Sequence, residues 1–251
     1  MAEDLTWRST NPALKADTFT KAPSSVGEEA MTIVGTVNKT ALALLVLLVS
    51  ASWSWTLGPD NSRLWGLMFV STVGGFIVGL VTIFKQPWAP YTTPVYAALE
   101  GMALGTISRG FELRYPGLVS QVVILTFGTL GVMLLAYRSG LIRPSENFKL
   151  GVAAATGSIA LIYLLSFVVD LLGGSLPWVD SGGMVGLLVR GFVVTIAALN
   201  LVLDFDFIRQ GAERGAPKYM EWYGAFGLLV TLVWLYMEIL RLLAESQSED
   251  D

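Results

Sequence analysis

Two carboxylates at the end of a long apolar run are the side chains of this sequence best placed to do chemistry. Asp204 and Asp206 follow the run that starts at Ala197, and Arg209 comes directly after them. A charged carboxylate beside hydrocarbon costs several kcal/mol, so it is buried against protein or water, or it carries a proton. Asp204 shares a helix face with Asn200, whereas Asp206 points to nearly the opposite side. We expect Asp204 to face the protein. Simple solvation at the inner membrane surface remains an alternative for both aspartates, and it has more support for Asp206.

Two further acids lie in the apolar part of the chain. Glu100 stands in the middle of a predicted helix, too far from either end to reach water, so we expect it to have a functional or pairing role. Glu221 stands at the start of the last predicted helix. A negative charge is stabilised there by the helix dipole, and this structural role is the simpler interpretation.

Arg190 and Glu238 lie in the last two predicted helices, which run in opposite directions. Both residues then belong to the outer half of the membrane, which leads to the hypothesis of a buried Arg190–Glu238 pair. The alternative is that Glu238 pairs with Arg241, three residues later on its own helix.

The composition describes a membrane protein. Of the 251 residues, 53% are hydrophobic and only 14% are charged, whereas about a quarter of the residues of a soluble domain are charged. Histidine and cysteine are absent, which excludes disulfides, thiol nucleophiles, Ser-His-Asp triads and zinc sites of the Cys/His type. Any proton sensing must therefore use carboxylates. No cofactor, nucleic-acid partner or enzymatic activity is indicated.

The hydrophobic pattern predicts an all-α integral membrane fold with seven transmembrane helices. We divide the chain into a cytoplasmic tail (1–39), a seven-helix transmembrane domain (40–244) and an acidic C-terminal tail (245–251). The predicted spans are 40–57, 64–84, 92–108, 117–137, 150–172, 184–207 and 220–244.

Basic residues orient the predicted helices. They are concentrated in the N-terminal tail and in the loops after the second, fourth and sixth spans, for example Lys85, Lys149 and Arg209. Cytoplasmic loops carry an excess of lysine and arginine, so we predict a cytoplasmic N-terminus and an external C-terminus.

Four stretches together resemble the Bax inhibitor-1 family, in its bacterial YccA-like branch. The resemblance runs over roughly residues 35–245. Its motifs are Tyr96 to Gly105, with Glu100 inside it; Pro116 to Thr129; Leu203 to Arg209; and Ile239 to Leu243.

The resemblance implies a bundle in which the seventh helix is central and the other six wrap around it. It also implies a cation leak pathway, with calcium as the ion discussed for the family. Its gate is a pair of aspartates on the sixth and seventh helices, assisted by a basic residue near the end of the second. Asp204 matches the sixth-helix aspartate and Lys85 lies near the basic position, but the seventh-helix position holds Thr231.

Two functions remain open at this stage. The first is a pH-sensitive cation leak channel of the bacterial inner membrane, gated by protonation of Asp204. The other residues predicted around its pathway are Asp206, Thr231, Lys85, Glu100 and Asn200. The second is a non-conducting adaptor that binds a membrane AAA protease in quality control. The threonine at position 231 favours the second, because threonine cannot repel Asp204 as an anion.

Overall fold

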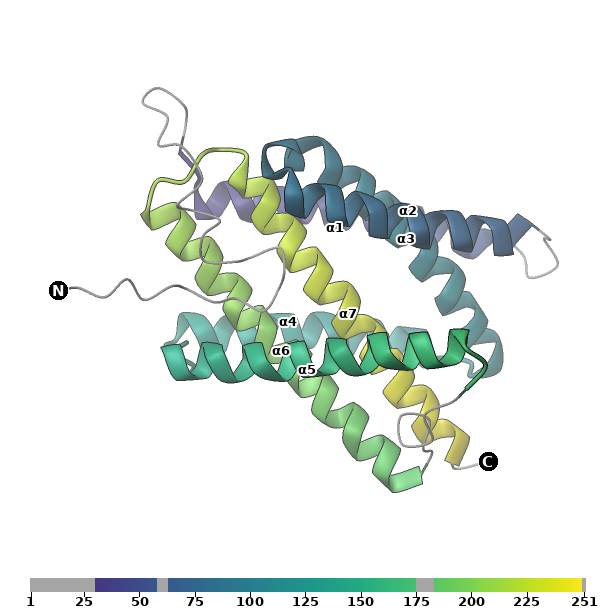
Figure 1. Cartoon of the computed structure of the whole chain (residues 1–251). Coiled ribbons are helices and arrows are strands. Elements are labelled where there is room, and N and C mark those ends of the chain that lie inside the picture. The colour runs from purple at the N-terminus through teal and green to yellow at the C-terminus, as the bar shows by residue number, and fades with distance from the viewer. Residues whose placement is uncertain (1–29, 58–62, 175–182, 250–251) are drawn as a thin grey trace.

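The computed structural model describes residues 30–57, 63–174 and 183–249, and in these ranges the chain is almost entirely helical (Figure 1). The all-α prediction is therefore confirmed. The remainder of the predicted N-terminal tail, 1–29, lies outside the described residues. The helices are α1 (Ile33–Thr56), α2 (Arg63–Phe84), the short 3-10 helix η2 (Gln86–Trp88), α3 (Ala89–Arg114), α4 (Leu118–Arg138), α5 (Glu146–Leu171), α6 (Gly183–Glu213) and α7 (Met220–Glu249).

Several helices extend beyond the predicted spans, and three of these extensions, in α1, α6 and α7, involve residues of the candidate site or of the predicted tails. Helix α1 begins at Ile33, because Thr32 caps it by accepting a hydrogen bond from the amide of Gly35. Helix α6 continues to Glu213 instead of ending at Phe207, so Asp204 and Asp206 lie within a helix. Helix α7 continues to Glu249, which makes most of the predicted acidic tail helical.

Six of the helices in the described part of the chain are long and apolar enough to cross a membrane: α1, α2, α4, α5, α6 and α7. Helix α3 does not meet that criterion, although we predicted a span at 92–108. It is long enough, but four charged residues interrupt it, namely Glu100, Arg109, Glu112 and Arg114. Packing against α1, α2 and α7 covers much of its surface.

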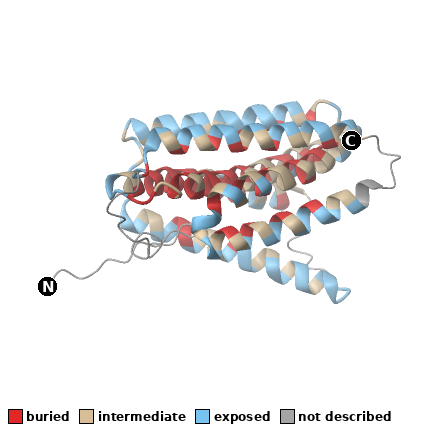
Figure 2. Cartoon of the chain, turned by 90° about the horizontal axis from the view of Figure 1, so that it is seen from above, coloured by how far each residue is buried: buried red, intermediate tan, exposed pale blue. Residues whose placement is uncertain are grey.

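Helix α7 forms the centre of the bundle, as expected. It packs directly against α1, α3, α4 and α6, while α2 packs mainly on α3, and α5 packs on α6. Buried residues are concentrated in the middle of the molecule and exposed ones on the outer helices (Figure 2). The largest fully buried side chains include Tyr223, Phe226, Leu229 and Leu235 of α7. The outer helices instead expose many large apolar side chains, such as Phe76 of α2, as a surface in contact with lipid must.

Helices α1 and α3 make the closest approach in the bundle. A Cβ atom on Gly101 would lie 2.2 Å from the carbonyl oxygen of Leu47, and one on Gly105 would lie 2.2 Å from that of Ala51. Glycine pairs four residues apart allow two membrane helices to approach this closely.

The start of α1 is attached to the turn between α6 and α7. That turn uses Gly215, whose φ of 65° suits glycine. The amide of Met31 donates to the carbonyl of Ala216 at 2.7 Å, and Ala30 forms an isolated bridge with Pro217. Because α7 has 30 residues, it is about 45 Å long. The two ends of the described chain therefore lie at opposite ends of the bundle (Figure 1).

Candidate functional site: buried acids of the two last helices

Asp204 is fully buried, with 0% of its surface exposed. Every residue of α6 from 200 to 208 is buried, so this part of the helix is surrounded on all sides. Most of these neighbours are apolar, including Leu201, Val202 and Leu203. The alternative of simple solvation is thus wrong for Asp204, because its carboxyl group lies inside the protein.

The side of α6 that carries Asp204 faces α7. Ile208, one turn after Asp204, would touch a Cβ atom on Gly224 of α7 at 3.1 Å, and Phe207 packs against Tyr223 with ring centres 6.4 Å apart. The two helices run antiparallel, so one turn back along α6 corresponds to one turn forward along α7. This spacing puts Asp204 at the level of Leu228, which is also buried.

Asp206 is the centre of a charged cluster that links three helices. It accepts a hydrogen bond from Tyr137 of α4 at 3.2 Å and forms ion pairs with Lys149 of α5 at 2.8 Å and with Arg209 at 3.0 Å. Gln210 also donates to it, at 2.5 Å. Only 3% of Asp206 is exposed, so the solvation alternative is wrong here too. The cluster neutralises the carboxylate and holds α4, α5 and α6 together at one end of the bundle.

Glu221 joins the start of α7 to the start of α1. Its carboxylate accepts hydrogen bonds from the amide and the hydroxyl group of Thr32, each at 2.9 Å, and forms an ion pair with Lys39 at 2.5 Å. Lys218 lies 3.4 Å away on the other side. The carboxylate fits against the backbone of Gly35, where any Cβ atom would lie 2.0 Å from its oxygen. Glu221 thus places its negative charge at the N-termini of two helices, α1 and α7, and not only at that of its own helix.

Glu238 is held at the other end of α7. It accepts hydrogen bonds from Tyr163 of α5 and from Trp234, and Arg241 pairs with it at 3.5 Å. Arg190 does not make the predicted pair with Glu238 but bonds Glu245, two turns further along α7. The alternative Glu238–Arg241 pair is the one that the structure contains.

Comparison of the sequence with known protein families gives a clear match. A family model described as Bax inhibitor 1 like matches residues 11–248, nearly the whole chain. The chain belongs to the Bax inhibitor 1 like family. Comparison with curated proteins and with solved structures gave no significant match. Together with the six apolar helices, family membership makes the chain a multi-pass membrane protein in contact with the lipid bilayer.

The other residues predicted around the pathway do not all gather around Asp204. Thr231 is buried on α7, but it lies seven residues after Gly224 and therefore about one turn beyond the level of Asp204. Asn200 donates to Thr156 of α5 at 2.8 Å and to a carbonyl group of its own helix, so it ties α6 to α5.

Lys85 and Glu100 also lie elsewhere in the structure than the predicted pathway beside Asp204. Lys85 is exposed between α2 and η2. The lysine that reaches the central helix is instead Lys39 of α1, which we did not single out because its apparent position was in the tail. Glu100 is half-buried and packs against α2, where a Cβ atom on Gly75 would lie 2.8 Å from its Oε1 atom.

The described residues contain no group of three or more acidic side chains placed to hold a metal ion. Asp206, Glu221 and Glu238 are each paired with at least one basic side chain, so their charges are largely compensated. Asp204 is likewise buried, on the side of α6 that faces α7.

Proposed function

We propose that this protein is a pH-sensitive cation leak channel of the bacterial inner membrane, with calcium as the permeating ion and Asp204 as the gating group. The proposal rests on the complete burial of Asp204 on the face of α6 that packs against α7. Membership of the Bax inhibitor 1 like family supports the same assignment. Carboxylate oxygens are the ligands that a hard cation such as calcium prefers.

The protonation state of Asp204 would control how tightly α6 and α7 close. The neutral form of the carboxyl group suits a fully buried position between two membrane helices. An ionised carboxylate in the same position requires water or a cation, because burial without either costs several kcal/mol. Ionisation would therefore draw water between α6 and α7 and favour the open state.

We propose the orientation in which the N-terminus is cytoplasmic and the C-terminus external. Support comes from the basic side chains at one end of the bundle, where α1 and α7 begin: Lys39 and Lys218 beside Glu221, and Lys149 and Arg209 beside Asp206. An excess of lysine and arginine is typical of the cytoplasmic face.

Replacing Asp204 with asparagine tests the gate. In liposomes containing the purified protein, we expect calcium flux to rise about tenfold between about pH 5 and about pH 8, the range in which a buried carboxyl group can titrate. The Asp204→Asn variant should stay near the low-pH flux at every pH, because its side chain cannot ionise. The measurement is the uptake of calcium by a dye inside the liposomes.

Asp170→Asn is the matched control for this experiment. Asp170 is exposed at the end of α5, so the same chemical change there should leave the pH profile of the wild type unchanged. A wild-type profile in the Asp204→Asn variant would contradict the gating role, and absence of flux from the wild-type protein at every pH would contradict the channel itself.

The second candidate function is a non-conducting adaptor for a membrane AAA protease. It is favoured by Thr231, since a second acid able to repel Asp204 does not stand at that position. A deletion of residues 1–28 separates the two functions and keeps Ala30 and Met31, which attach α1 to the turn before α7. The adaptor function predicts that the deletion abolishes co-purification of the protease, whereas the channel function predicts unchanged flux.

A further inference from the structure

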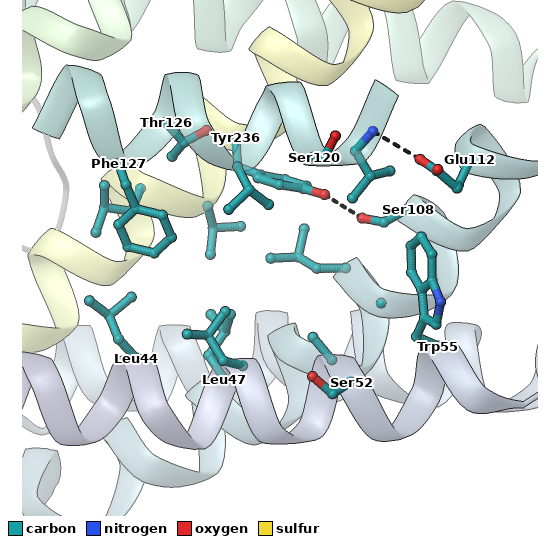
Figure 3. Close-up of a pocket in the computed structure, with 18 of the residues that line it drawn as sticks. Leu44, Leu47, Ser52, Trp55, Ser108, Glu112, Ser120, Thr126, Phe127 and Tyr236 are labelled. Carbon is teal, nitrogen blue, oxygen red and sulfur yellow. Dashed lines mark hydrogen bonds between the residues drawn. The ribbon is translucent and has the colours of Figure 1, made fainter. Parts of the chain in front are cut away.

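A cavity of about 630 Å³ lies among α1, α3, α4 and α7, away from Asp204 (Figure 3). Its volume is within the range of about 300–1,000 Å³ that is typical of sites for small molecules. Leucine, valine and phenylalanine side chains make up most of its wall, among them Leu44, Leu47, Leu104, Leu229, Leu232 and Phe127.

The cavity opens sideways, toward the lipid. Three of its lining residues are also exposed on the outside of the bundle: Leu48 of α1 at 44%, and Val123 and Phe127 of α4 at 37% and 39%. Both α1 and α4 are apolar enough to span a membrane, so the opening between them faces hydrocarbon. An apolar cavity in that position is open to acyl chains and closed to water.

One end of the cavity is polar and the other is apolar. Figure 3 shows Trp55, Ser108 and Glu112 together at one end, and Leu44 and Phe127 at the other. The hydroxyl groups of Ser108 and Tyr236 are 2.6 Å apart. Two hydroxyl groups have two hydrogens and their mutual bond uses one, so the pair retains a hydrogen that it can donate to a ligand.

The polar end is lined by one acid, Glu112, and a base, Arg109, lies next to the lining residue Ser108. Glu112 is engaged by the start of α4, where its oxygens accept hydrogen bonds from the amides of Gly117 and Val119 at 2.7 and 3.0 Å. Arg109 follows Ser108 directly and places its guanidinium carbon 5.5 Å from the centre of the Trp55 ring. The Nε atom of Arg109 is buried and donates no hydrogen bond within the described structure, so this N–H group lacks an acceptor.

We propose that the cavity binds one acyl chain of an anionic phospholipid, with the phosphate group beside Arg109 and the ester region at the Ser108–Tyr236 pair. A phosphate oxygen is the acceptor that a guanidinium group prefers. A transmembrane helix of a second copy does not fit, since a helix about 10 Å wide and about 30 Å long is several times larger than the cavity. The proposal does not depend on channel activity.

Lipid binding to the purified protein tests the headgroup contact. In native mass spectrometry with phosphatidylglycerol and phosphatidylcholine added in equal amounts, the wild type should retain one phosphatidylglycerol molecule with a preference of about tenfold, equivalent to ~1.4 kcal/mol. The Arg109→Gln variant should lose this preference. Arg138→Gln, an exposed change at the other end of α4, should keep it.

A second pair of variants tests the acyl-chain site. Val123→Trp should fill the opening and reduce retention of both lipids, whereas Ile124→Trp, one residue away and 71% exposed to lipid, should bind like the wild type. Equal retention of both lipids by the wild type, or unchanged binding by the Val123→Trp variant, would overturn the proposal. A dimer whose formation the Val123→Trp variant abolishes would also overturn it.

Discussion

Replacing Gly105 with alanine should lower the stability of the folded bundle by about 3 kcal/mol, the upper part of the range for an overpacked core. The added methyl group would lie 2.1 Å from the hydroxyl oxygen of Ser54 and 2.2 Å from the carbonyl oxygen of Ala51. The hydroxyl group can rotate away, but the carbonyl belongs to the backbone of α1. Relief therefore requires α1 and α3 to separate along their length.

The membrane makes this separation costly. Two helices in lipid are not driven together by the hydrophobic effect, so their association depends on close packing. The α1–α3 contact is the most extensive in the described bundle, and Gly101 approaches α1 as closely as Gly105 does. The double variant Gly101→Ala/Gly105→Ala should consequently be less stable than either single variant.

Gly110 provides the control on the same helix. It is exposed and a Cβ atom there would meet nothing within 4 Å, so Gly110→Ala should leave stability unchanged or raise it by up to about 1 kcal/mol through helix propensity. The measurement is unfolding of the purified protein in mixed detergent micelles, followed by tryptophan fluorescence. Equal midpoints for Gly105→Ala and Gly110→Ala would contradict the close α1–α3 contact.

Replacing Glu221 with alanine should have an effect of similar size. The change removes the acceptor of two Thr32 hydrogen bonds and of the Lys39 ion pair, and Glu221 is 0% exposed. Breaking a buried ion pair by removing one partner costs about 3–5 kcal/mol, because the remaining charge has lost its compensation. Lys39 retains some access to solvent, so we expect the lower end of this range, measured by the same unfolding experiment.

Two further variants test why the Glu221→Ala variant should lose stability. Glu146→Ala also removes an acid from a lysine, Lys149, but Glu146 is half exposed and its removal should cost less than about 1 kcal/mol. The double variant Lys39→Met/Glu221→Met should be more stable than Glu221→Ala, since it removes the more buried lysine charge together with the acid, and the remaining Lys218 is more exposed to solvent. A double variant no more stable than Glu221→Ala would show that the carboxylate matters only as a packing group.

The sequence was sufficient for the overall architecture because hydrophobic length and charge are local properties. Each predicted span lies largely within an observed helix, and the resemblance correctly implied that the last helix is central. The error at α1 arose because we treated the absence of charge as the start of the helix. The cap at Thr32 begins the helix two turns earlier, and this places Lys39 on α1.

The ion-pair partners of the buried acids could not be predicted from the sequence. They depend on the level of each side chain in the membrane and on contacts between segments that are far apart in the chain. Helix spacing placed Arg190 and Glu238 in the same half of the membrane, and Glu245 was assigned to the acidic tail. Helix spacing did not distinguish Glu238 from Glu245, which are seven residues apart and share a helix face. Lys149 and Asp206 likewise meet only because α5 packs against α6.

The bonds between Thr32 and Glu221 also constrain how the protein is made. The two residues are 189 positions apart, and Glu221 belongs to α7, which leaves the ribosome after α1 to α6. During synthesis, α1 enters the bilayer with its capping threonine and Lys39 still lacking their acceptor. Insertion of α7 then supplies Glu221, which binds Thr32 and Lys39 at the start of α1. A chain truncated before Met220 should therefore hold α1 loosely and be a substrate for degradation.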